Sequence, residues 1–79
     1  MYTVNRAIQD YQLEIRAAKE WAASGRTHIN GRAVPEELAG QYGPEGCTVD
    51  DYIRWWTDRL ARLEELKAAG QEDASEYNY

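Results

Sequence analysis

Histidine, cysteine and phenylalanine are nearly or wholly absent from this chain of 79 residues, which has one His, one Cys and no Phe. With Cys47 as its lone cysteine, a single chain forms no internal disulfide, and Cys47 and His28 are too few to hold structural zinc. A lone cysteine is typical of proteins of a reducing cytoplasm. We therefore predict no metal and no cofactor, and expect stability to come from helix packing or from assembly with other chains.

Long apolar runs are also missing. No stretch approaches the roughly 20 consecutive apolar residues of a membrane-spanning helix, so we predict no membrane partner. The hydrophobic fraction of 43% and the charged fraction of 29% are typical of a soluble globular protein. A chain of 79 residues has room for one domain at most.

Basic residues are scarcer than acidic ones, with nine Lys and Arg against 14 Asp and Glu and a net charge of −5. The excess acids gather in residues 36–51 and 72–76, which contain no base, and the rest of the chain is mildly basic. Binding to nucleic acid requires a cationic face, so we predict no direct nucleic-acid partner. The acidic segments are compatible with a basic protein partner, with mimicry of DNA, or with solvation alone.

No pattern of catalytic residues is found, so we predict that the protein is not an enzyme. Nucleophilic catalysis needs a Cys or Ser beside a base, and Cys47 and His28 lie in different segments with no signature around either. Paired carboxylates occur at 36–37, 50–51 and 64–65, but acid–base catalysis needs a concave site that separates their pKa values. Helix capping explains the second pair, and exposure on a helix surface explains the third.

Residues 3–24 have the periodicity of an amphipathic helix. Thr3 can cap its first turn, and Gly25 suits the left-handed residue that ends a helix. Leu13 falls on the side of this helix opposite its stripe of apolar residues. It is either an isolated exposed leucine or a contact to a partner. The stripe, with spacings of four and three, consists of Val4, Ile8, Tyr11, Ile15, Ala18 and Ala22.

A second helix is predicted over residues 48–69. TVDD is a capping box in which the Thr48 hydroxyl accepts from the Asp51 amide, and Gly70 ends the helix. Trp55 and Leu66 flank the buried face, so the apolar band is wide enough to contact the first helix and a partner. The buried face consists of Val49, Tyr52, Ile53, Trp56, Leu60 and Leu63.

Between these helices, residues 27–34 predict a short β-hairpin. Asn30-Gly31 is a strong signal for a type I′ turn, which needs a positive φ at both central residues. Residues 35–47 follow as a turn or two of helix and then a loop that ends at Cys47. The predicted fold class is therefore α+β, mainly α, with two long antiparallel helices and a short β-hairpin between them.

The last residues, 71–79, are predicted to lie outside this domain, which spans residues 1–70. Their sequence, QEDASEYNY, is too polar for a core element and predicts a flexible acidic and aromatic tail. Its two tyrosines suggest that the tail folds on binding, and the alternative is a frayed terminus.

The order of elements resembles the W family of phage head–tail joining proteins. The segments that carry the resemblance are AASGRTHINGRAV (22–34), TVDDYIRWWTDRLARLEEL (48–66) and the terminal EYNY. Members of this family have a first helix followed by Gly, a hairpin with a Gly-Arg turn, and a Ser- or Thr-capped helix rich in Leu. Relative to that pattern, residues 35–47 are an insertion.

The resemblance implies a non-enzymatic connector that docks on the portal, completes the head and joins it to the tail. Free, such a protein is a monomer in the host cytoplasm; assembled, it forms a homo-oligomeric ring in the virion. The family's hairpin and C-terminal tail are its docking parts, and the surplus apolar residues add to them. The predicted partner-binding residues are Asn30, Gly31, Leu13, Trp55, Leu66, Tyr77, Asn78 and Tyr79.

A second hypothesis rests on composition alone. Acidic segments combined with aromatic surface residues suit a small phage-encoded inhibitor of a host defence complex, of the anti-CRISPR kind, that mimics DNA. Reversing the acids at Glu36, Glu37 and Glu45 would abolish binding by such an inhibitor, and deleting residues 76–79 would matter little. For a connector, deleting residues 76–79 would abolish particle completion and leave the melting of the monomer unchanged.

Overall fold

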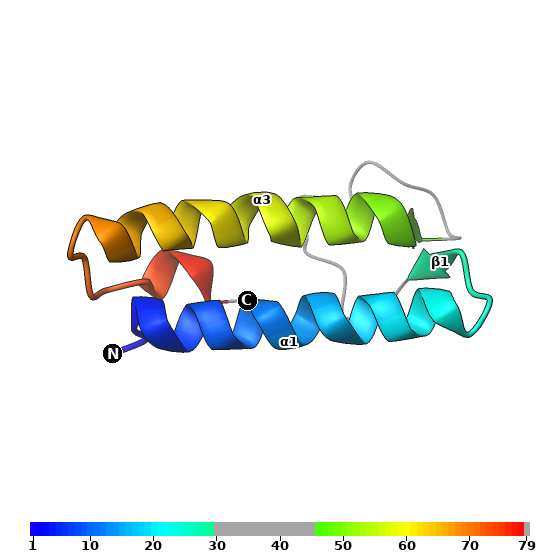
Figure 1. Ribbon diagram of the computed structural model, residues 1–79, viewed down its shortest axis with the longest axis horizontal. Helices are drawn as coiled ribbons and strands as arrows, with labels where there is room; N and C mark the ends of the chain where they lie inside the picture. The colour runs from blue at the N-terminus through cyan, green and yellow to red at the C-terminus, as the bar shows by residue number, and fades with distance from the viewer. Residues whose placement is uncertain (30–45, 79) are drawn as a thin grey trace.

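The computed structural model describes residues 1–29 and 46–78. Two helices of 20 residues each, α1 (Val4–Ala23) and α3 (Val49–Ala68), lie side by side and antiparallel (Figure 1). Short strands β1 (His28–Ile29) and β2 (Cys47–Thr48) pair near the end of α1. A single 3₁₀ turn, η2 (Ser75–Tyr77), follows α3. The predicted class, α+β and mainly α, is confirmed.

Both helices begin and end where the sequence predicts, because their signals are local. The Thr3 hydroxyl accepts from the Arg6 amide at 3.1 Å, and the Thr48 hydroxyl accepts from the Asp51 amide at 3.2 Å. Each cap satisfies one amide that has no partner within its helix. Gly70, just past α3, has a φ of +82°, which a residue with a Cβ rarely adopts.

The core lies in the seam between α1 and α3. Most of the predicted stripe is buried there, but Ala22 is exposed and Ala7 is fully buried instead. In Figure 1 the last turn of α1 extends past the first turn of α3. Ile8, Ile53 and Leu60 lie at the edge of the seam and are half-buried. The buried set is Val4, Ala7, Tyr11, Ile15, Ala18, Cys47, Val49, Tyr52, Trp56, Leu63 and Ala74.

The sequence did not predict the pairing of β1 with β2, and only residues 27–29 of the predicted hairpin (27–34) are described. β1 pairs with β2 in antiparallel register, with Ile29 opposite Cys47, and the Val49 amide donates to the Thr27 carbonyl at 2.9 Å. Cys47, predicted to end a loop, lies in a strand. Because α3 returns antiparallel to α1, the entry to α3 lies beside the exit from α1. The predicted turn at residues 30–31 lies outside the described residues.

Residues 71–78 also differ from expectation, because the structure places them against both helices rather than outside the domain. The Val4 amide donates to the Glu72 carbonyl and the Ala74 amide to the Tyr2 carbonyl, each at 2.8 Å. Ala74 is only 2% exposed. The segment is polar in composition, but two of its residues, Ala74 and Tyr77, pack against the core. In Figure 1 the segment lies beside the first turns of α1.

Candidate functional site

The C-terminal segment is held in a defined turn by Asp73. The carboxylate accepts from the Ser75 amide at 3.1 Å and from the Ser75 hydroxyl at 2.6 Å. These hydrogen bonds favour the ionised form and so lower the pKa of Asp73 below its usual value. The turn starts η2 and directs Tyr77 back toward α1.

Tyr77 is the anchor of this segment. The Tyr11 hydroxyl donates to the Tyr77 carbonyl at 2.9 Å, and the two rings meet edge to face with centroids 6.4 Å apart. The guanidinium carbon of Arg59 lies 4.9 Å from the Tyr77 ring centroid and 4.8 Å from that of Trp55. Aromatic pairs and cation–π contacts of this kind are favourable in these geometries. Tyr77 is thus held from α1 and from α3.

A groove of about 310 Å³ opens between α1 and this segment, and we call it the tyrosine groove. Its floor is made by Tyr11 and Trp56, which are buried and in contact at a centroid distance of 4.6 Å. Its sides combine half-buried aromatic rings with carboxylates of α1 and polar groups of the C-terminal segment. The lining residues are Tyr2, Asp10, Tyr11, Leu13, Glu14, Trp56, Tyr77 and Asn78.

Two carboxylates of the tyrosine groove accept hydrogen bonds from tyrosine hydroxyls. The Tyr2 hydroxyl donates to Asp10 at 2.9 Å, and Asp10 also pairs with Arg6 at 3.1 Å. The Tyr52 hydroxyl donates to Glu14. Burial and then the bond to Asp10 raise the pKa of Tyr2 to about 12, and burial and then the bond to Glu14 raise the pKa of Tyr52 further.

Three predicted partner-binding residues come together in the tyrosine groove. Leu13, which is 58% exposed, lines it together with Tyr77 and Asn78. Leu66 lies in a second hollow of about 280 Å³ on another side of Tyr77. Trp55 is half-buried against Trp56 and Arg59. The other three, Asn30, Gly31 and Tyr79, lie outside the described residues.

Trp21 is an exposed aromatic residue that is not among the predicted partner-binding residues. It is 40% exposed, and its indole nitrogen donates to the His28 carbonyl at 2.9 Å. The guanidinium carbon of Arg26 lies 4.0 Å from its ring centroid. These contacts tie the end of α1 to β1. The signal in the sequence was a tryptophan next to, rather than within, the apolar stripe.

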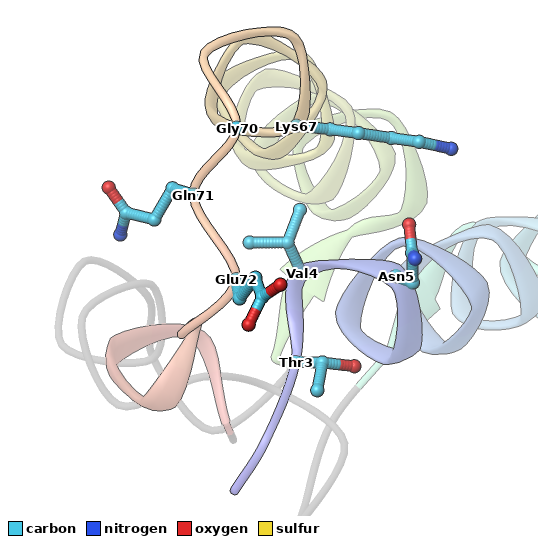
Figure 2. Close-up of a pocket in the computed structure, with 7 residues that line it drawn as sticks. All are labelled: Thr3, Val4, Asn5, Lys67, Gly70, Gln71 and Glu72. Carbon is cyan, nitrogen blue, oxygen red and sulfur yellow. The ribbon is translucent and has the colours of Figure 1, made fainter.

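A third hollow, of about 420 Å³, lies where the first turn of α1 meets the segment that follows α3. Figure 2 shows Lys67 extending to one side of it and Gln71 pointing to the other. Val4 points between them toward α3. Lys67 and Gln71 therefore point away from each other.

The strand pair places Cys47 and His28 closer than expected, but not as a catalytic pair. His28 is opposite Thr48 and Ile29 is opposite Cys47, so the side chains of His28 and Cys47 lie on opposite faces of the pair. Burial raises the pKa of the Cys47 thiol, which disfavours the reactive thiolate. Within residues 1–29 and 46–78, no group of three or more potential metal ligands occurs.

Comparison of the chain with family models, with curated proteins and with solved structures gave no match in any of the three. In the described part of the chain, no helix is long and apolar enough to cross a membrane.

Proposed function

We propose that this protein is a non-enzymatic adaptor that binds another protein through Leu13 and the tyrosine groove. The observation that carries the proposal is the position of Leu13, a large apolar side chain that is 58% exposed at the edge of a hollow lined by aromatic rings. Exposed apolar residues beside Tyr and Trp are typical of the centres of protein interfaces. A rigid two-helix scaffold holds this surface in place before binding.

We further propose that the adaptor is a phage head–tail connector and that its partner is the portal of a DNA-filled head. This finer proposal is supported by the resemblance of residues 22–34 and 48–66 to the W family. Copies of the chain would form a ring on the portal, each contacting its neighbours through a second surface. Trp55 and Leu66, both half-buried on α3, are the residues we assign to that second surface.

The test introduces a charge at the apolar edge of the groove. Leu13→Asp should abolish binding to purified portal rings, measured by co-sedimentation, because it replaces an apolar contact with a carboxylate whose desolvation in the interface is costly. Ala61→Asp is the matched control, since Ala61 is an exposed position on the outer side of α3. Both variants should keep the helical circular dichroism of the wild type.

Two results would contradict the proposal. If Leu13→Asp binds portal rings as the wild type does, the groove edge is not the docking surface. If the wild type fails to bind portal rings but binds a nucleic-acid-processing complex with strong dependence on salt, the inhibitor hypothesis replaces the connector. The acids at residues 36, 37 and 45, which that hypothesis uses, lie outside the described residues.

A further inference from the structure

We propose that the tyrosine groove binds one arginine side chain of the partner protein, with Glu14 as its counter-ion. This inference rests on the proposed adaptor function and specifies what the partner must present. It combines three features of the groove, namely its aromatic lining, its charge and its size.

The aromatic lining suits a flat cation. Tyr2 and Tyr77 are half-buried at the sides of the groove, and Trp56 lies at its floor. A guanidinium group stacks on such rings and loses little hydration in doing so. The protein already contains this contact, because Arg59 lies 4.9 Å from the centroid of Tyr77.

The charge of the groove also favours a cation. Both oxygens of Asp10 are engaged, one with the Tyr2 hydroxyl and one with Arg6. Glu14 differs from Asp10 in having no basic partner in the described part of the chain. Its Oε1 accepts a hydrogen bond from the Tyr52 hydroxyl, and it makes no ion pair with any described residue. Since Arg6 offsets the charge of Asp10, the Glu14 carboxylate gives the groove one negative charge that no side chain within residues 1–29 and 46–78 neutralises through an ion pair.

The size of the groove restricts the occupant to a side chain. Its volume of about 310 Å³ is at the lower end of the range for ligand pockets, which is roughly 300–1,000 Å³. One long side chain fits this space, with its methylene groups against Leu13 and its charged end at Glu14. Arginine is favoured over lysine because its planar fork can donate two hydrogen bonds to one carboxylate while it stacks on a ring.

The probe for this inference is the capped tripeptide acetyl-Gly-Arg-Gly-amide, titrated into the full chain. Saturable amide shifts in ¹H–¹⁵N spectra should be confined to the groove, at Leu13, Glu14 and Asn78. The same tripeptide with citrulline, which has the shape of arginine without its charge, should bind at least about tenfold more weakly, since a hydrogen bond to a charged group is worth more than a neutral one. Equal binding of the citrulline or the lysine tripeptide would overturn the assignment of arginine.

Glu14→Gln is the deciding variant, because its amide oxygen can still accept from the Tyr52 hydroxyl. It should weaken binding of the arginine tripeptide about tenfold. Glu20→Gln, which removes the same charge from an exposed position on α1, should leave binding unchanged. Equal affinities of the two variants would refute the role of Glu14.

The two proposals fail separately. If the arginine tripeptide does not bind but Leu13→Asp still abolishes binding to portal rings, the arginine site is refuted and the adaptor function stands. If the tripeptide binds as expected but Leu13→Asp leaves portal binding intact, the arginine site stands and the groove edge is refuted as the surface that docks on the portal.

Discussion

Replacing Tyr77 by alanine tests whether the C-terminal segment is part of the domain. The substitution removes a half-buried ring that contacts Tyr11 and lies under the guanidinium of Arg59. Partial burial of an aromatic ring contributes about 1 kcal/mol, and the aromatic pair and the cation–π contact each add about 0.5–1 kcal/mol. We therefore expect Tyr77→Ala to lower the free energy of unfolding by about 2–3 kcal/mol.

For a domain of this size, such a loss corresponds to a fall in Tm of roughly 10–20 °C. Thermal unfolding followed by the helical circular dichroism signal would measure this fall in Tm. The expected loss is large, because a domain of this size has a total stability of only roughly 4–12 kcal/mol. Asn78→Ala is the matched control, because the Asn78 side chain is exposed and its loss should change stability by less than about 0.5 kcal/mol.

A flexible tail predicts the opposite result. If Tyr77→Ala and Asn78→Ala both unfold at the wild-type temperature, the contacts of Tyr77 do not contribute to stability and the C-terminal segment is not part of the domain. Hydrogen exchange gives an independent reading, since the Ala74 amide, bonded to the Tyr2 carbonyl, should be protected only if the segment is docked.

Three other predictions concern stability. Leu63→Ala should lower the free energy of unfolding by about 2–5 kcal/mol in chemical denaturation, because Leu63 is fully buried. Leu60→Ala should lower it less, because Leu60 is only half-buried, and the reverse order would contradict the described core. Thr48→Ala should cost about 1 kcal/mol by the same measurement, as it removes a helix cap, whereas Thr48→Ser should cost little. The pKa values of Tyr2 and Tyr52 are raised in the folded state, so the folded state keeps their hydroxyl protons when the unfolded state loses them near pH 10. Their contribution to the free energy of unfolding should therefore be fully present below pH 10 and be lost as the pH rises toward 12 and above. An unchanged Tm at about pH 11 would contradict this.

The helices could be predicted from the sequence because the groups that define them are near one another in the chain. Thr48 caps an amide three residues away, and glycines with positive φ follow each helix. The apolar spacing in residues 4–18 fixed which side of α1 faces the core. The spacing did not predict that Ala7 is fully buried, Ile8 half-buried and Ala22 exposed, because the packing against α3 decides how far each residue is covered.

The strand pair and the tyrosine groove could not be predicted in the same way, because their partners are far apart in the sequence. Cys47 is a strand residue only because α3 starts beside the end of α1. Tyr11 and Tyr77 are 66 residues apart and share a hydrogen bond.

The sequence by itself determined two capped amphipathic helices and an exposed Leu13, since helical periodicity and capping are properties of neighbouring residues. Only the tertiary structure decided that Leu13, Glu14 and Tyr77 border one groove. The physical reason is that the polar segment after α3 gains its stability from surfaces that exist only once the two helices have packed, and composition alone does not record those surfaces.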